Sequence, residues 1–224
     1  MLNDYQMDNT RCQVAQALAE IGDKSAVDPL SRAIREPLDK RRYYGNDAIS
    51  YKSYYEAEQA AFALALVKLG SIDAVVQGLK EEMDRWYRDR YEINHNLVKS
   101  YTRALLASKT PKKIVPYIAE FIWESEPPWT GLIELSTFFA DALGSLGLPD
   151  CVEPLISAIS SRTKEVRESA ARALVRLYAN SSLPEALRQR ILSERPKIIA
   201  PHDDYFYSES CEHHDKGIGV EFPL

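Results

Sequence analysis

One phrase of eighteen residues occurs twice in the chain and constrains what it can fold into. Residues 17–34 read ALAEIGDKSAVDPLSRAI and residues 142–159 read ALGSLGLPDCVEPLISAI, and the two align without a gap. Weaker copies start at Ala65, Ala104 and Ala173, so consecutive copies are 48, 39, 38 and 31 residues apart. Self-similarity at such a period is typical of repeat proteins, in which each unit buries its apolar face by stacking on its neighbours.

Each copy of the phrase marks a turn between two helices. Gly22, Gly70 and Gly147 follow apolar segments of helical period, where a glycine ends the helix by adopting a positive φ at no steric cost. Asp23 and Asp150 come shortly afterwards and are predicted to cap the next helix. Prolines early in that next helix cost little, because the first turn has no partner for an N–H: Pro29, Pro116 and Pro154.

The repeat therefore predicts an all-α fold, an α-solenoid of about five helix pairs over residues 1–196. After Pro196 the helical pattern stops, and we expect residues 197–224 to form an irregular acidic tail. Met1–Asp8 offers little to cover the first unit, so we expect either an oligomeric neighbour or upstream repeats there. The last unit shows the apolar stripe of one helix face most clearly: Val166, Ala170, Ala173, Leu174 and Leu177.

The segment EVRESAARALVRL (165–177) and the phrase at 17–34 resemble the short HEAT-like repeat of phycobilisome lyases and many bacterial scaffold proteins. The resemblance covers roughly residues 8–194 and departs from the pattern at Gln77, Lys109 and Tyr178. It implies a HEAT-like solenoid and, for function, a lyase subunit, a signalling scaffold or an immunity-type binder. The matching positions are Val166, Arg167, Ala170, Ala171, Ala173 and Leu174, and again Ile21, Gly22, Asp23, Val27, Pro29 and Leu30.

The first three intervals exceed the unit length of about 30 residues, and their extra residues fall at equivalent junctions between one helix pair and the next. These inserts are residues 36–55, 84–94 and 124–131. Loops at equivalent junctions emerge along one edge of a solenoid, which is often its binding face. An alternative is that the inserts lengthen the helices and their aromatic residues pack over helix ends. Since Tyr, Trp and Arg are enriched at interface hot spots, we predict a partner-binding surface: Arg41, Arg42, Tyr43, Tyr44, Tyr51, Tyr54, Tyr55, Arg85, Trp86, Tyr87, Arg88, Tyr91 and Trp129.

The charge pattern argues against nucleic acid as the partner. The net charge is −5, and in residues 84–92 the three arginines are balanced by Asp84, Asp89 and Glu92. No apolar run approaches the roughly 18 residues that a membrane-spanning helix needs, and the polar N-terminus does not resemble a secretion signal. Three widely separated cysteines fit reduced thiols. We therefore expect a cytoplasmic protein with a protein partner, and neither nucleic acid nor membrane.

The tail offers two hypotheses. Imidazole, thiolate and carboxylate groups gather there, although their spacing matches no standard metal site and a solvated tail is the simpler interpretation. The last residues alternate apolar side chains as on one face of a strand, which predicts docking on the end of the solenoid or on a partner. The metal candidates are His202, Cys211, His213, His214 and Asp215, and the docking candidates are Ile218, Val220, Phe222 and Leu224.

No catalytic residue and no cofactor is predicted, because no nucleophile motif, P-loop or dinucleotide fingerprint occurs. His95 is interpreted as a surface residue early in a helix. Cys12 and Cys151 lie near helix starts, where a thiol pKa can fall, yet packing is the interpretation that their helical context favours.

The leading hypothesis is a non-enzymatic protein-binding scaffold or adaptor that uses the concave face and the aromatic and arginine-rich edge of the solenoid. One alternative is an accessory subunit of a bilin (phycobiliprotein) lyase, for which the segment 41–55 is the candidate pocket. Another is an immunity-type protein whose acidic surface neutralises a basic partner, and a third is metal binding by the tail.

Overall fold

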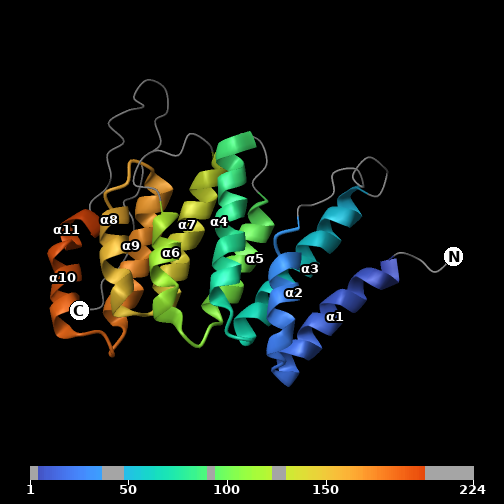
Figure 1. Cartoon of the computed structure of the whole chain (residues 1–224). Helices are drawn as coiled ribbons and strands as arrows, with labels where there is room; N and C mark the ends of the chain where they lie inside the picture. The colour runs from blue at the N-terminus through green and yellow to red at the C-terminus, as the bar shows by residue number, and fades with distance from the viewer. Residues whose placement is uncertain (1–4, 37–47, 90–93, 123–129, 200–224) are drawn as a thin grey trace. The chain divides into compact units, whose positions relative to one another are not determined.

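The structure is a computed structural model in which residues 5–36, 48–89, 94–122 and 130–199 are described. These residues form helices and short turns and contain no β-strand, which confirms the predicted all-α class. The helices follow one another in pairs, as the repeat predicts (Figure 1). Short 3₁₀ turns join the members of three of the pairs: Lys24–Ala26, Pro111–Lys113 and Pro149–Cys151.

The first helices of the five pairs are α1 (Tyr5–Ile21), α3 (Ala48–Lys68), α5 (His95–Leu106), α7 (Thr130–Leu146) and α9 (Lys164–Ala179). The second helices are α2 (Val27–Ala33), α4 (Ile72–Asp89), α6 (Val115–Glu120), α8 (Val152–Ala158) and α10 (Glu185–Ser193). A further short helix, α11 (Arg195–Ile199), follows the last pair and crosses the predicted boundary of the tail at residue 196.

The chain divides into two compact units, Met1–Pro111 and Lys112–Leu224, so the boundary falls in the turn between α5 and α6. In unit 1, α1 packs on α3 and α3 packs on α5, while α2 and α4 pack beside them. In unit 2, α7 packs on α9, and α6, α8 and α10 pack on these two helices or on one another. Each unit thus stacks its first helices in a row, whereas the continuous solenoid stays a prediction.

The turns within the pairs follow the predicted glycine chemistry. Gly22, Gly70 and Gly147 have φ values of 79°, 84° and 67°, the left-handed conformation that glycine adopts without strain. Asp23 caps the following turn, since its Oδ1 accepts hydrogen bonds from Ser25 Oγ at 2.7 Å and from the Ser25 N–H at 2.9 Å. These two hydrogen bonds also lower the pKa of Asp23.

The predicted cap at Asp150 is wrong. Leu148, and not Asp150, is the residue that precedes the 3₁₀ turn Pro149–Cys151. Leu148 provides no side-chain hydrogen bond to this turn. Pro149 occupies the first helical position, where its missing N–H removes one of the donors that a cap would satisfy. Asp150 therefore lies inside the turn and is exposed.

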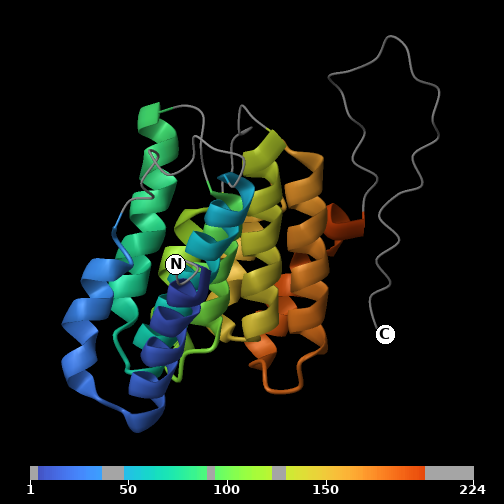
Figure 2. The same cartoon turned by 90° about the vertical axis from the view of Figure 1, so that its right-hand side faces the viewer.

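The first helices of unit 2 approach closely because small residues face each other. Gly144 in α7 lies against Ala173 in α9, and a Cβ atom added at Gly144 would lie 2.6 Å from the Ala173 Cβ and 2.9 Å from its Cα. Figures 1 and 2 show α7 and α9 side by side in both views. The contact leaves no room for a methyl group, so the α7–α9 separation depends on this glycine.

We expect Gly144→Ala to destabilise the protein by about 1–3 kcal/mol, because overpacking forces the two helix backbones apart. The matched control is Gly78→Ala in α4, where the new Cβ would meet Tyr101 Cε2 at 3.4 Å in ordinary contact. This control should be neutral or stabilising by up to about 1 kcal/mol, since alanine favours a helix over glycine. Urea unfolding of both variants measures the difference, and equal stabilities would contradict the prediction.

Candidate partner-binding edge

In unit 1, two junctions between helix pairs lie at the same end of the helices, where α2 leads to α3 and α4 leads to α5 (Figure 1). We call this region the junction edge of unit 1. It comprises residues 33–36 at the end of α2 and after it, residues 52–59 of α3, Glu82 of α4, and residues 94–101, which are the cap and the first half of α5. The predicted inserts 36–55 and 84–94 begin and end here, so the edge positions both of them.

A buried hydrogen-bond network joins three helices at this edge. The Tyr101 hydroxyl of α5 donates to Gln59 Oε1 of α3 at 3.0 Å and lies 3.3 Å from the Ile34 carbonyl oxygen after α2. Gln59 Nε2 in turn donates to the Ala33 carbonyl oxygen at 3.0 Å. Tyr101 and Gln59 are each only 1% exposed. Their side chains therefore bind two carbonyl oxygens at the end of α2, of which that of Ala33 also accepts from the Glu36 N–H at 3.2 Å.

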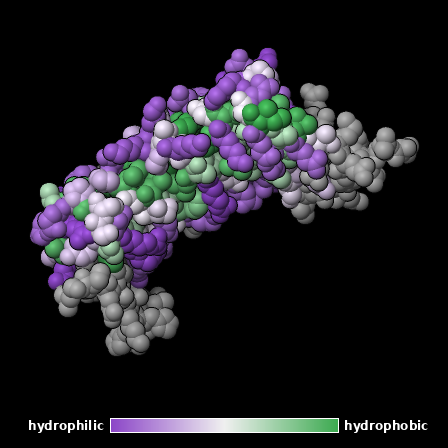
Figure 3. Space-filling model, turned by 90° about the horizontal axis from the view of Figure 1, so that it is seen from below, coloured by the Kyte–Doolittle hydropathy of each residue, from purple (hydrophilic) through white to green (hydrophobic). Residues whose placement is uncertain are grey.

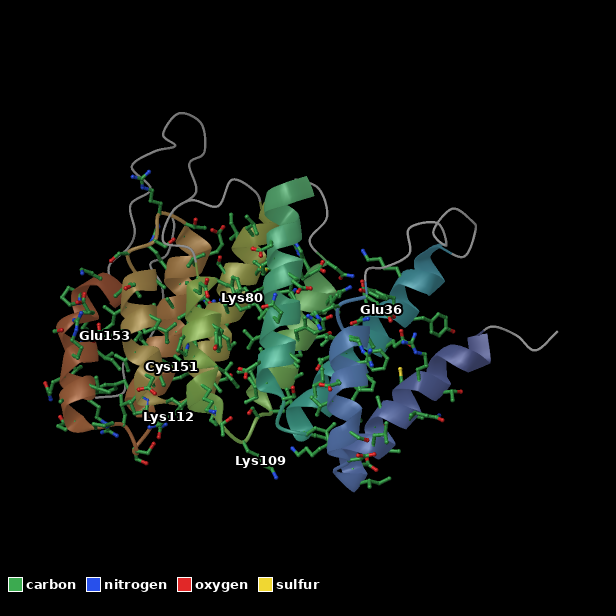
Figure 4. The ribbon with its side chains drawn as sticks, in the orientation of Figure 1. Glu36, Lys80, Lys109, Lys112, Cys151 and Glu153 are labelled. Carbon is green, nitrogen blue, oxygen red and sulfur yellow. The ribbon has the colours of Figure 1, made fainter. Side chains whose placement is uncertain are left out.

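Tyr55 and Glu36 close the base of the first insert. The Tyr55 hydroxyl donates to the Glu36 carbonyl oxygen at 2.9 Å, which ties the residue after α2 to the second turn of α3. Figure 4 labels Glu36 in this region, after α2 and near α3. Tyr55 therefore has a structural role at the edge, as the alternative interpretation of the inserts predicts for individual aromatic residues.

Glutamates and asparagines fix the second junction. The Asn94 N–H donates to Glu82 Oε1 of α4 at 3.0 Å, and Glu82 is only 3% exposed. Asn94 also caps α5, because its side chain accepts a hydrogen bond from the Leu97 N–H at 3.2 Å. Asn96 Nδ2 donates to Glu56 Oε2 of α3 at 3.0 Å. The described end of the second insert is thus tied to α4 through Glu82 and to α3 through Glu56.

The described part of the edge carries charges of both signs: Glu36, Glu56, Glu58 and the buried Glu82 are offset by Arg35, Lys52 and Lys99, and by Arg11 of α1. Arg11 Nη1 lies 3.0 Å from Glu58 Oε1, and its Nη2 lies 3.8 Å from Glu36 Oε2. The Arg11 guanidinium also lies 5.3 Å from the centre of the Phe62 ring, within cation–π distance. Lys52 and Glu56 form a further pair at 4.0 Å. Such half-exposed pairs contribute little stability individually, so their main effect is to shape the charge of the surface.

The predicted site residues are distributed unevenly over the described structure. Tyr54 is 38% exposed on α3, next to Tyr55, and Tyr51 belongs to the first turn of the same helix. Helix α4 continues to Asp89, so the start of the second insert lengthens a helix, and Arg85, Trp86, Tyr87 and Arg88 belong to its last turns. The remaining members of the predicted surface lie outside the described residues: Arg41, Arg42, Tyr43, Tyr44, Tyr91 and Trp129.

The tail residues also lie outside the described part of the chain, so both tail hypotheses stay predictions: His202, Cys211, His213, His214 and Asp215 for metal, and Ile218, Val220, Phe222 and Leu224 for docking. Within the ranges that the structure describes, no group of three or more metal-ligating side chains is gathered for an ion. Among those same ranges, no helix combines the length and apolar character needed to cross a bilayer.

Cys151 packs in the interior, as its helical context predicts. The residue is 0% exposed in the turn before α8 (Figure 4), and burial raises the pKa of its thiol to about 11. His95 is the first residue of α5, directly after the Asn94 cap, in the position expected from the sequence. It is half-buried.

Sequence reasoning did not identify Gln59, Tyr101 and Glu82, which organise the edge. Gln59 and Tyr101 are 42 positions apart, and no short motif contains either of them. A signal was nevertheless present in the sequence. Gln59 lies one helical turn before the apolar Phe62 and Ala63 of α3, and a polar side chain on a buried helix face needs a hydrogen-bond partner.

Residues 10–36 match the family model described as PBS lyase HEAT-like repeat. The matched segment runs from the second turn of α1 through α2, so it covers the first helix pair. The match confirms one HEAT-like repeat at the first helix pair, where the sequence predicts it. No curated protein and no solved structure gives a significant match.

We expect Tyr101→Phe to lower the free energy of unfolding by about 1 kcal/mol, because it leaves Gln59 Oε1 and the Ile34 carbonyl without their shared donor in a buried site. Tyr55→Phe removes a hydroxyl from a more exposed hydrogen bond on the same edge and should cost less. Chemical denaturation of the two variants gives the comparison. Equal costs would show that the buried network does not organise the edge.

We expect Cys151 to resist alkylation in the folded protein. With a thiol pKa of about 11, roughly one molecule in a thousand carries the reactive thiolate at pH 8, and the side chain is inaccessible. Iodoacetamide labelling at pH 8, followed by peptide mass spectrometry, should modify Cys151 only after denaturant is added. Rapid labelling without denaturant would contradict the buried position.

Proposed function

We propose that this protein is a non-enzymatic scaffold that binds a protein partner at the junction edge of unit 1. The observation that carries the proposal is the set of hydrogen bonds that holds the described ends of both inserts at one end of unit 1, from Tyr55 of α3 with Glu36 at one junction to Asn94 with Glu82 of α4 at the other. Hydrogen-bonded helix ends that flank aromatic and arginine-rich segments of the sequence suit protein recognition.

The HEAT-like repeat supports the same class of function. Stacked helix pairs present extended surfaces that vary at their junctions without disturbing the stack. Glu36, Glu56 and Glu58 of the junction edge form ion pairs with Arg11 and Lys52, so the edge offers charges of both signs for polar contacts with a partner. An adaptor or immunity-type protein that covers a basic surface of its partner is the narrower form of the proposal.

A bilin lyase accessory role is the second candidate, and the family match at residues 10–36 is the observation that favours it. Such a role needs arginines for propionate groups and aromatic rings for a planar tetrapyrrole, and residues 41–55 offer both types of side chain. Co-expression with a bilin source separates the two candidates. Bilin absorbance that co-purifies with the protein would support the lyase role, and colourless protein would support the scaffold.

The direct test is an affinity pull-down from native lysate with the intact chain and an edge variant. The edge variant changes Tyr43, Tyr44, Trp86 and Tyr87 to alanine together with Tyr54→Ala. We expect the intact chain to capture a stoichiometric protein and the edge variant to lose at least ten-fold of it, because aromatic anchors carry a large share of interface free energy.

The matched control is Leu64→Ala. Leu64 is 40% exposed on the same helix as Tyr54, which is 38% exposed, but it lies outside the junction edge. The control should capture the partner as well as the intact chain does. Equal capture by the edge variant would overturn the proposal, and capture of no protein at all would count against a scaffold.

A further inference from the structure

The third helix pair concentrates positive charge. Residues 94–119, which span α5 and nearly all of α6, contain five lysine or arginine residues and no carboxylate, in a chain whose net charge is −5. Three of these cations lie in the turn between the two helices and are exposed, and we call them the turn lysines: Lys109, Lys112 and Lys113. In Figure 4, Lys109 points away from the helices. Figure 3 looks onto the end of the helices that carries the turns within the pairs and shows many hydrophilic side chains there.

The turn holds these lysines close together. Ser108 and Thr110 shape it, since the Thr110 N–H donates to Ser108 Oγ at 3.1 Å and the two hydroxyl oxygens are 3.3 Å apart. Lys109 and Lys112 are three positions apart, so covalent geometry alone keeps their Cα atoms within roughly 11 Å. Within the ranges that the structure describes, the ammonium groups of the turn lysines make neither hydrogen bonds nor ion pairs. Their charges are therefore available to an anionic group.

Two of these cations lie where the fold disfavours them. The start of a helix carries a partial positive charge, which stabilises acidic side chains and destabilises cations nearby. Helix α6 has no acidic residue in its first turn, and Lys112 and Lys113 come just before it. Helix formation does not account for two lysines at this position, whereas an anionic group bound to their side chains does. The other four second helices each have an acidic residue in the first turn: Asp28 in α2, Asp73 in α4, Glu153 in α8 and Glu185 in α10.

The chain itself contains a segment of matching charge. Residues 198–215 include five carboxylates and neither lysine nor arginine. We call residues 203–215 the acidic segment, after its carboxylates: Asp203, Asp204, Glu209, Glu212 and Asp215. A nucleic-acid backbone is a poorer match, because three lysines neutralise only about three phosphates and the chain as a whole is negative.

The acidic segment is long enough to reach the turn lysines of unit 2. It begins four residues after Ile199, the last described residue, and residues 200–215 span up to roughly 55 Å when extended. Within unit 2, α10 contacts both α11 and α8, and the turn before α8 contacts α6. Packed helices lie about 8–10 Å apart, so the three helix spacings from α11 to α6 are well within this reach.

We propose that the acidic segment binds the turn lysines of the same chain. The contact consists of ammonium–carboxylate pairs, and it neutralises the two cations that precede α6. Because the turn lysines are exposed, the contact is reversible and weakens as ionic strength rises. The tail thereby excludes other anionic groups from this turn until salt or a stronger acidic ligand displaces it.

Carbodiimide cross-linking of the full chain tests the contact directly, because this reagent joins an amine to a carboxylate where the two groups touch. An equal mixture of unlabelled and heavy-nitrogen chains separates cross-links within one chain from cross-links between chains. We expect the acidic segment to be joined to the turn lysines within one chain. These cross-links should exceed those to the exposed Lys52 and Lys68 of α3 about ten-fold at low salt, and the excess should vanish in about 0.5 M salt.

Chymotrypsin cleavage of the full chain within the sequence 205–207, Tyr-Phe-Tyr, gives a second readout. The turn variant, Lys112→Gln with Lys113→Gln, should speed this cleavage about five-fold at low salt, because it removes charges that hold the segment. The matched control, Lys52→Gln with Lys68→Gln, removes the same charge from exposed positions of α3 and should leave the rate unchanged. Both variants change exposed side chains, so the helical circular dichroism should stay that of the unchanged chain.

Three results would overturn the proposal. The first is equal cross-linking of the acidic segment to the turn lysines and to Lys52 and Lys68. The second is cross-links found only between unlabelled and heavy chains, which would assign the segment to a second copy. The third is an equal cleavage rate in the turn variant and the unchanged chain, which would leave the turn lysines to an acidic segment of a partner protein.

Discussion

The structure depends on one contact that recurs between consecutive first helices. All five copies of the repeat place an alanine followed by a leucine on the first helix, at Ala17, Ala65, Ala104, Ala142 and Ala173. The alanine permits close approach of the backbones, and the leucine that follows it is 0% exposed in all copies after the first. Burying a leucine side chain contributes about 1.5–3 kcal/mol, so this repeated leucine stabilises each of the four later first helices.

The same contact explains why the junctions tolerate so much variation. The repeated alanine and leucine lie in the C-terminal half of each first helix, near the turn within the pair, and the junctions lie at the opposite end. The inserts fall between one helix pair and the next, so they change neither the repeated alanine and leucine nor the turn within a pair. In unit 1 hydrogen bonds hold this opposite end together. Gln59 of α3 and Tyr101 of α5 bond to each other and to carbonyl oxygens at the end of α2.

Features that depend on neighbouring residues could be predicted from the sequence. The turn glycines, the Asp23 cap, the helix pairs and His95 at the start of α5 all follow from local patterns, and the structure confirms them. Asp150 was assigned incorrectly because Pro149 intervenes: aligned with the first copy, Asp150 corresponds to Ser25 and not to Asp23. The junction network could not be predicted, since Glu82, Asn94, Gln59 and Tyr101 meet only after three helices have packed.

The open end of unit 1 follows from the energetics of stacking. In a repeat protein the stability is approximately a sum over neighbouring units, so an end helix packs on one side only. Helix α1 exposes Val14 and Ile21, at 51% and 78%, at positions of the repeat that are buried in α3. Arg11 lies on this helix and also pairs with Glu58 and Glu36 at the junction edge. The packing of α1 on α3 therefore also brings a cation to the edge, so a change that loosens α1 removes this charge from the edge as well.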